Sequence, residues 1–219
     1  MTRRSGTHAI VPVKPFARAK TRLAQMLSPE ARRVLASAML LDVIAALRAA
    51  RMIERVWVVS LDREILKGAA RLGAVPLEEE FDMGLNRALR FATRTAAGDG
   101  AGRVLIVPSD VPLVTAADID ALVGAAARAR SPRSVIAVPS RDGTGTNALL
   151  RTPPAVIPPR FGAGSLRRHA QEAERHGVPF FLRRASRMML DVDTPAELVL
   201  LARRARGHTA RALRRLGFL

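Results

Sequence analysis

Short runs of apolar residues alternate along the chain with longer stretches in which apolar side chains recur at helical spacing. Continuous apolar runs occur at 8–13, 56–60, 103–108 and 134–139. Such runs are typical of strands that are buried on both faces of a parallel sheet. In segment 28–50 the apolar positions fall at i, i+3, i+4 and i+7, which predicts one buried helix face; they are Leu40, Val43, Ile44 and Leu47.

These patterns predict strands at 8–13, 56–60, 74–77, 103–108, 134–139, 146–150 and 179–183, and a last strand that ends at Asp191. They predict helices at 28–50, 62–72, 84–97, 116–130 and 164–176, and a C-terminal helix that opens at Thr194. Ser28 followed by proline predicts an N-terminal cap, and Thr194 with Glu197 three residues later predicts a capping box.

Strands that alternate with helices predict an α/β fold with a mostly parallel sheet and helices on both faces. We expect a single domain over 1–219, with its core at about 8–200 and an arginine-rich C-terminal helix at 201–219. In such sheets ligands bind at the carboxyl ends of the strands, where the strand order reverses. Residues that directly follow the apolar strands are therefore the candidates for chemistry.

A basic loop follows the first predicted strand. Only three of the 36 basic residues are lysines, yet two of them lie in this loop. Its cations are Lys14, Arg18, Lys20 and Arg22. Such cations can clamp the phosphates of a nucleoside triphosphate, although the loop lacks the glycines of a P-loop. The loop predicts phosphate binding; a solvated basic turn is the alternative.

Three aspartates follow predicted strands. Asp110 comes after strand 103–108, and Asp191 and Asp193 end the last predicted strand, where residues i and i+2 point to one face. Carboxylates at these places can hold one or two metal ions, and Mg²⁺ takes one or two protein carboxylates with phosphate oxygens. The alternatives are a turn-forming Asp110 and an arginine that neutralises the other two.

Two glycine-containing stretches, 141–147 and 161–165, have backbone N–H groups and hydroxyls that can surround an anion. Glycine loops also simply turn the chain. His169, in the helix that follows, is more typical of a surface residue than of a catalyst. Asn86, at the start of another helix, is a candidate contact to a base or ribose, or a plain capping residue.

Composition restricts the classes of function. The net charge of +17 indicates a polyanionic partner such as nucleic acid, a phosphorylated metabolite or a membrane surface. Aromatic residues make up only 4% of the chain, which leaves few stacking platforms for single-stranded nucleic acid. A general drift towards arginine is the plainer explanation of the charge. The absence of cysteine excludes a disulfide scaffold, a thiolate zinc site and a cysteine nucleophile.

No apolar run approaches the ~18 to 20 residues of a membrane span. Pro12 and Lys14 interrupt the apolar stretch that a signal peptide would need. We therefore expect a cytoplasmic protein that acts without membrane or nucleic acid, and a homodimer is compatible with the sequence.

Five motifs occur in the order VPVKPFARAKTRLA, PSDVPL, GTGTNALL, RFGAGSLRRH and DVDTPAEL. Together they resemble the CofC/FbiD family of guanylyltransferases, which act in the biosynthesis of coenzyme F-420, over about residues 8–200. The resemblance implies a Rossmann-like nucleotidyltransferase fold. It also implies transfer from GTP to 2-phospho-L-lactate, phosphoenolpyruvate or 3-phospho-D-glycerate, with release of diphosphate.

The resemblance assigns roles to residues of this chain. It implies that Asp110, Asp191 and Asp193 are catalytic and hold Mg²⁺. The GTP site would include Lys14, Lys20 and Arg22 at the phosphates, with Asn86 as a further contact. The phosphorylated acid would bind at Thr146, Asn147, Gly162 and Ser165. Asn147 stands where some members have threonine, so the identity of the acid stays open.

Two other classes of protein fit parts of the sequence. Another nucleotidyltransferase of similar fold, acting on molybdopterin or a sugar nucleotide, would usually carry a glycine-rich loop after the first strand. A basic nucleic-acid-binding protein would explain the charge and the arginine-rich end but not three aspartates at strand ends. The C-terminal segment itself is expected to be a capping helix with solvent-facing arginines; a membrane-surface helix is the weaker alternative.

Overall fold

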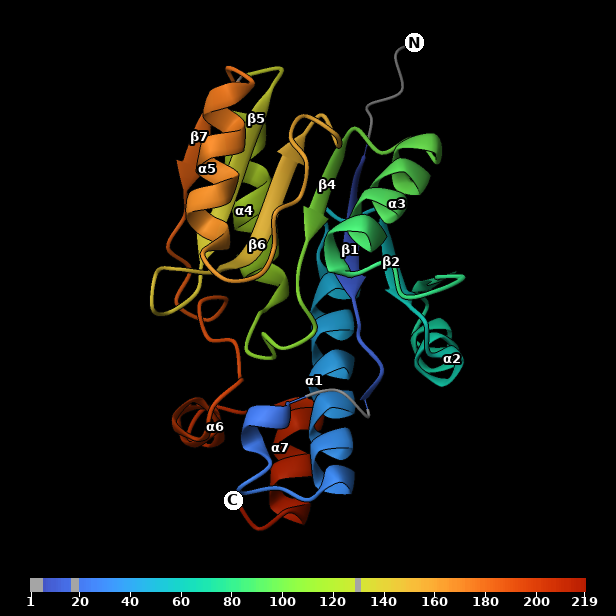
Figure 1. Cartoon of the computed structure of the whole chain (residues 1–219), viewed down its shortest axis with the longest axis vertical. Helices are drawn as coiled ribbons and strands as arrows, with labels where there is room; N and C mark the ends of the chain where they lie inside the picture. Colours follow the sequence, from blue (N-terminus) through green and yellow to red (C-terminus); the bar gives the residue numbers. More distant parts are fainter. Residues whose placement is uncertain (1–5, 17–19, 129–130) are drawn as a thin grey trace.

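The computed structural model describes residues 6–16, 20–128 and 131–219 of the chain. Its centre is a seven-stranded sheet with the strand order β3-β2-β1-β4-β6-β5-β7 (Figure 1). The strands are β1 Thr7–Pro12, β2 Arg55–Ser60, β3 Val75–Glu78, β4 Arg103–Ile106, β5 Ser134–Pro139, β6 Thr146–Thr152 and β7 Phe180–Leu182. β6 runs antiparallel to β4 and β5, and the other neighbouring strands are parallel.

Within the described residues, seven helices and a short 3-10 helix lie between and after the strands. They are η2 Thr21–Leu23, α1 Pro29–Ala49, α2 Arg63–Arg71, α3 Leu85–Gly98, α4 Ala116–Arg128, α5 Ser165–Arg175, α6 Pro195–Ala202 and α7 Gly207–Arg215. Both predicted caps are confirmed: Ser28 Oγ accepts from the Ala31 amide, and Thr194 and Glu197 form a capping box. The predicted end of α4 at residue 130 lies outside the described residues.

Two hydrophobic cores lie on opposite faces of the sheet. Ala9 and Val11 of β1 pack into the core that includes α1, α2 and α4. Ile10, between them, packs into the core that includes α3 and a residue of α5. Figure 1 shows α3 and α5 in front of the sheet and α4 behind it. Because both faces of β1 are covered, its residues 9–12 are continuously apolar rather than alternating.

A third hydrophobic cluster lies beyond the sheet, where α6 and α7 lie near the lower half of α1 (Figure 1). Leu213 of α7 and Leu198 of α6 are fully buried there with Leu35 of α1. The predicted helix that opens at Thr194 is α6, which ends at Ala202, and the arginine-rich segment forms a second, shorter helix, α7, after a turn.

The apolar side of α7 is covered by protein, because Ala210 and Leu213 are buried while Arg211, Arg214 and Arg215 are exposed. This confirms the capping helix and contradicts a membrane-surface helix, whose apolar side must be free. Among the described residues, no helix has both the length and the apolar character that a membrane crossing requires.

The predicted strand that ends at Asp191 is also wrong. Residues 183–193 form a turn and an unpaired extended segment. Met188, Leu190 and Val192 are buried at every second position, and this alternation produced the strand-like pattern. These side chains fill the core without joining a sheet; the Val192 amide instead donates to the carbonyl of Asp110 at 3.1 Å.

Candidate active site

The site lies where the strand order reverses, between β1 and β4. The segments that follow these two parallel strands meet at the same edge of the sheet. Lys20, after β1, donates from Nζ to Oδ2 of Asp110, after β4, at 2.8 Å. The same Nζ donates to Oδ1 of Asp193 at 2.8 Å. One ammonium group thus joins three segments of the chain.

The backbone of Lys20 is left-handed, with φ 54° and ψ 38°. Within the described ranges it is the one non-glycine residue with positive φ. Such a conformation costs energy in a residue with a Cβ and persists where the surroundings enforce it. Burial lowers the pKa of Lys20, but the charges of Asp110 and Asp193 and their hydrogen bonds outweigh it, so that the pKa is raised. Lys20 is therefore a charged, buried ammonium.

Asp191 lies beside this ion-pair cluster. Its Oδ1 accepts from Nδ2 of Asn147 at 3.0 Å, and Asn147 is itself buried. Burial raises the pKa of Asp191, and the negative charge of Asp110 raises it further. Glu197 holds the neighbouring backbone, because its Oε2 accepts from the amides of Asp193 and Thr194 at 2.7 and 2.8 Å. The structure thus gathers the three predicted aspartates with Asn147.

The donor set agrees in kind with a Mg²⁺ site, since carboxylate oxygens are its preferred protein ligands. Asp110 and Asp193 point at one common cation, which here is the Lys20 ammonium. In the described part of the chain no three acidic or histidine side chains are already grouped to hold a metal ion. The cation that neutralises Asp110 and Asp193 is a lysine. The alternative to a metal ion that we considered from the sequence was an arginine.

The loop before β6 is held by its own side chains. Asp142 accepts from the amide and the hydroxyl of Thr144 at 3.0 and 2.7 Å. A hydrogen bond from Ser140, together with those from Thr144, lowers the pKa of Asp142 to about 2. Because β6 is antiparallel, its first residue, Thr146, lies at the edge of the sheet where β5 ends. This places Thr146 and Asn147 beside the aspartates.

A second loop, 161–165, precedes α5 and contacts the first. Ser165 Oγ donates to Thr146 Oγ1 at 3.2 Å, and the Leu166 amide donates to the Thr144 carbonyl at 3.1 Å. Gly162 has φ +111°, a conformation open to glycine but strained for other residues. The two predicted acid-binding stretches therefore form one continuous wall.

Asn86 supports this wall from α3. Its Oδ1 accepts from the Phe161 amide at 2.8 Å, and its Nδ2 donates to the Phe161 carbonyl at 3.0 Å. The side-chain amide is thus engaged with the loop backbone. The contact of Asn86 with a base or ribose stays a prediction, and the structure adds a positioning role.

The other predicted cations of this loop differ from Lys20 in their surroundings. Lys14 and Arg22 are exposed, and Arg22 lies in η2, directly after Lys20 and Thr21. Arg18 lies outside the described residues. The role of Lys14 and Arg22 at phosphates therefore stays a prediction, whereas Lys20 is placed at the carboxylates.

The prediction that His169 lies on the surface is wrong. This residue is fully buried rather than on the surface. Its Nδ1 lies 3.0 Å from Thr146 Oγ1, and its Nε2 accepts from the Arg160 amide at 2.9 Å. Burial lowers its pKa to about 3, and nearby arginines add to the shift. The available signal was helical spacing, because Ser165 and His169 are four residues apart and so share a helix face.

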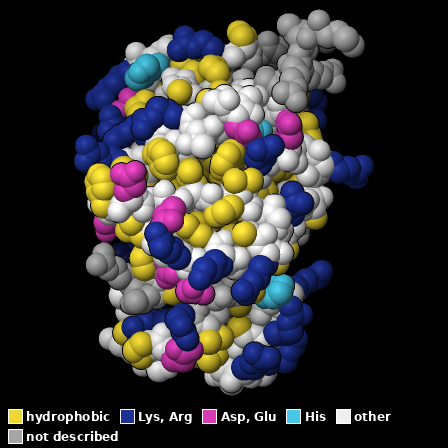
Figure 2. All heavy atoms as spheres, turned by 90° about the vertical axis from the view of Figure 1, so that its right-hand side faces the viewer, with side chains coloured by type: hydrophobic (Ala, Val, Ile, Leu, Met, Phe, Trp, Pro, Cys, Tyr) yellow, Lys and Arg dark blue, Asp and Glu magenta, His cyan; other side chains and the backbone are white. Residues whose placement is uncertain are grey.

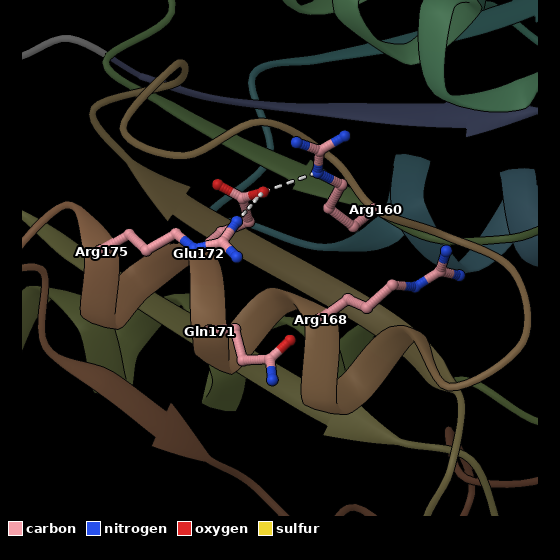
Figure 3. Close-up of a pocket in the computed structure, with 5 residues that line it drawn as sticks. All are labelled: Arg160, Arg168, Gln171, Glu172 and Arg175. Atoms are coloured by element: carbon pink, nitrogen blue, oxygen red, sulfur yellow. Dashed lines mark hydrogen bonds and ion pairs between the residues drawn. The ribbon is translucent and has the colours of Figure 1, made fainter.

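A hollow of about 240 Å³ is lined by residues of α5 and by Arg160 of the preceding loop (Figure 3). Arg160 and Arg175 approach the buried carboxylate of Glu172 at 2.7 and 3.6 Å. Arg168 lies further along the helix and donates to the Phe161 carbonyl at 3.3 Å. Three guanidinium groups with one carboxylate make the surroundings of the second loop positive.

A protein family matches nearly the whole chain. The family described as guanylyl transferase, CofC like, matches residues 7–219.

Curated relatives match over similar lengths. A phosphoenolpyruvate guanylyltransferase of Sphaerobacter thermophilus is 43% identical over 90% of this chain and 92% of its own length. A 2-phospho-L-lactate guanylyltransferase of Methanothermobacter thermautotrophicus is 40% identical over 97% and 92%. A 3-phospho-D-glycerate guanylyltransferase of Phenylobacterium zucineum is 36% identical over 89% of each chain.

The fold also matches solved structures. A nucleotidyl transferase from Methanothermobacter thermautotrophicus superposes with a TM-score of 0.67 at 15% identity, over 96% of this chain and 99% of the other. At this identity the match concerns the fold alone.

Proposed function

The chain belongs to the family of CofC-like guanylyl transferases, and from this premise we propose that it transfers the guanylyl group of GTP to a small phosphorylated carboxylic acid. Diphosphate leaves, and the reaction belongs to coenzyme F-420 biosynthesis. The observation that carries the proposal is the convergence of Lys20, Asp110 and Asp193 at the strand switch, beside Asn147.

The proposed reaction needs little acid–base chemistry. A phosphate oxygen of the acid attacks the α-phosphorus of GTP, a new P–O bond forms, and the bond to the leaving diphosphate breaks. A phosphate monoester is already largely ionised at neutral pH, because its second pKa is about 6. The barrier is the approach of two polyanions, which cations held in place can lower. Lys20, Lys14 and Arg22 are the proposed partners of the GTP phosphates.

We propose that Asp110, Asp191 and Asp193 hold Mg²⁺ when nucleotide is bound. A bound divalent cation would supply charge neutralisation at the phosphoryl oxygens. The Lys20 ammonium is the counter-ion of Asp110 and Asp193, which keeps the two carboxylates from facing one another unpaired.

The wall formed by the two glycine-containing loops is the proposed site of the phosphorylated acid. Thr146 and Ser165 offer hydroxyl groups, and Gly162 permits close backbone approach. Asn147 donates to Asp191 and so ties this wall to the metal ligands. The acid and the α-phosphate of GTP would meet between them. We propose that this occurs in the cytoplasm on soluble substrates.

Diphosphate release from GTP with Mg²⁺ tests the proposal. Phosphoenolpyruvate, 2-phospho-L-lactate and 3-phospho-D-glycerate are supplied singly, and ATP and CTP replace GTP as controls. We expect release that requires one acid and GTP together. Absence of release with every acid, from protein with a cooperative unfolding transition, would contradict the proposal.

The Asp191→Asn variant tests the metal assignment. It removes one negative charge but retains an oxygen that can accept from Asn147, so we expect the fold to persist. Turnover should fall by about 10²-fold or more, as is usual when charge stabilisation of a phosphoryl transfer is lost. Asp120→Asn, on α4, is the matched control. A folded Asp191→Asn enzyme with full activity would contradict the role of this carboxylate.

A further inference from the structure

The side chains of Thr146, Ser165 and His169 form a buried hydrogen-bonded cluster behind the proposed acid site. Thr146 Oγ1 lies 3.0 Å from His169 Nδ1 and 3.2 Å from Ser165 Oγ. Thr146 is 5% exposed, Ser165 2% and His169 0%. The mechanism proposed above assigns nothing to His169, although it is among the most deeply buried polar groups of the chain.

The main chain determines which nitrogen of His169 carries the proton. The Arg160 amide N–H donates to Nε2 at 2.9 Å. A backbone amide can only donate, so Nε2 must accept and carries no proton. In a neutral imidazole the proton is then on Nδ1, and Nδ1–H donates to Thr146 Oγ1.

This tautomer changes the number of donors that the cluster can offer. Thr146 and Ser165 together have two hydroxyl protons, and one of them forms the hydrogen bond between the two residues. Because His169 donates to Thr146, the second proton remains unused. With the other tautomer, Thr146 would have to donate to Nδ1 and Ser165 to Thr146, and no proton would remain.

We propose that His169 is a positioning residue whose Nδ1–H leaves one hydroxyl proton of the Thr146–Ser165 pair directed to an anionic oxygen of the phosphorylated acid. The inference rests on the proposed function for the identity of that ligand. A buried donor without an acceptor is unfavourable, and a charged oxygen is the strongest available acceptor. Within the protein cluster one hydroxyl proton has no acceptor, and an oxygen of the bound acid therefore supplies it.

The surroundings of His169 keep the imidazole neutral. Burial disfavours the charged form, and the guanidinium groups of Arg151, Arg168 and Arg160 add repulsion. Arg151 is fully buried and is held by Thr93 and the Ile157 carbonyl. The rings of Phe161 and His169 pack edge to face, with 5.0 Å between their centroids. An imidazolium would have two donors, and its Nε2–H would oppose the Arg160 amide.

Two substitutions separate positioning from support of the backbone. In His169→Asn the side-chain amide nitrogen takes the approximate place of Nδ1 and can donate to Thr146. In His169→Gln the side-chain oxygen reaches towards the place of Nε2 and can accept from the Arg160 amide. This variant has no donor for Thr146 Oγ1. His176→Gln, at the C-cap of α5, is the control outside this cluster.

Kinetics and unfolding are measured for the four proteins with the acid that the wild type uses. Loss of a hydrogen bond to a charged group should raise KM for the acid about tenfold to hundredfold in His169→Gln, with KM for GTP unchanged. His169→Asn should stay within about threefold of the wild-type KM, as should His176→Gln. A KM for the acid that is near the wild-type value in His169→Gln but raised in His169→Asn would overturn the proposal. A wild-type KM in both variants would overturn it as well.

The tautomer is measured directly on the wild-type protein by two-bond ¹H–¹⁵N NMR at about pH 7, independent of activity. The chain has four histidines, and the signal missing in His169→Gln identifies His169. We expect a neutral ring with the proton on Nδ1. A proton on Nε2 would overturn the proposal even if the variants failed to fold. Wild-type protein without guanylyl transfer to any acid would instead refute the proposed function and leave the tautomer result standing.

Discussion

At the scale of single residues, Lys20 joins parts of the chain that lie 90 and 173 residues away. Its side chain is only 7% exposed, while those of Asp110 and Asp193 are 25% and 44% exposed. A buried ammonium is stable only with partners, and the two carboxylates are less dependent on it because water reaches them. Lys20 thus keeps the two carboxylates together. Its ammonium charge also suits a phosphate, and the carboxylates also suit a metal ion.

Lys20→Met should therefore affect both stability and activity. We expect the free energy of unfolding to fall by about 2 kcal/mol. This is less than the ~3–5 kcal/mol that breaking a fully buried ion pair costs, because Asp193 stays partly hydrated. Turnover should fall about 10²-fold. Mg²⁺ should raise the Tm of this variant more than that of the wild type, since two unpaired carboxylates bind a cation better.

Urea unfolding, calorimetry with and without Mg²⁺, and the diphosphate assay check this expectation. Lys67→Met is the matched control, because Lys67 is exposed on α2 and pairs with Glu64 of the same helix. Wild-type turnover in Lys20→Met would contradict a role of Lys20 at the phosphates.

The lowered pKa of His169 links a single side chain to the acid stability of the fold. The native value is about 3 and the ordinary value is 6.5. Between these values the unfolded chain binds a proton that the native state does not, so stability falls as the pH falls. From neutral pH to about pH 5 the loss from this group is about 2 kcal/mol.

His169→Gln should remove this dependence. The difference in unfolding free energy between wild type and variant should narrow by about 2 kcal/mol between neutral pH and about pH 5, because the other titrating groups are common to both. Urea unfolding at a series of pH values measures it. A difference that stays constant with pH would show that His169 titrates near its ordinary value.

At the scale of elements, the antiparallel β6 and the pair α6–α7 decide the shape of the site. β6 returns between β4 and β5, and this brings the residues at its start to the edge where parallel strands end. α7 packs near α1, and Asp42 of α1 accepts from the amides of His208 and Thr209 at the start of α7. The arginine-rich end is thereby part of the folded core.

Leu213→Ala should destabilise the protein by about 3 kcal/mol, since it removes a fully buried side chain and leaves a cavity. Leu219→Ala, at a position that is 52% exposed, is the matched control and should cost less than about 0.5 kcal/mol. Urea unfolding measures both. Equal, small losses would indicate that α7 does not contribute to the cooperative core.

At the scale of the whole molecule, the net charge is +17, and on one face the positive side chains are dispersed. Figure 2 shows Lys and Arg over the whole of one face, with acidic and hydrophobic side chains between them. Several arginines pair with carboxylates, as Arg187 does with Asp118 and Arg55 with Asp99. A net charge of this size attracts polyanions at long range but does not by itself form a groove that follows a nucleic-acid backbone.

We therefore expect only weak, non-specific binding to duplex DNA, with Kd above about 1 μM at physiological salt and a steep decrease with salt concentration. Fluorescence anisotropy with a labelled duplex at increasing salt measures this, and GTP is added as a competitor for the active site. Submicromolar affinity at physiological salt would support the nucleic-acid-binding alternative.

Local signals were sufficient for most elements. The apolar runs of β1, β2, β4 and β5 are unbroken because helices cover both faces of the sheet, and the caps at Ser28 and Thr194 require only neighbouring residues. Position after a strand was enough to select Lys20 and Asp110, since parallel strands end at one edge. These features depend on neighbours within a few positions, so the amino-acid sequence by itself determined them.

Long-range contacts decided the rest. The segment before Asp191 has the apolar alternation of a strand but joins no sheet, and its Val192 amide donates to the Asp110 carbonyl instead. The burial of His169 depends on the 161–165 loop that Asn86 holds, and the meeting of Lys20 with Asp193 depends on the return of the chain through α5 and β7. Only the tertiary structure decided these points, because apolar spacing reports which side chains are buried but not which partners they find.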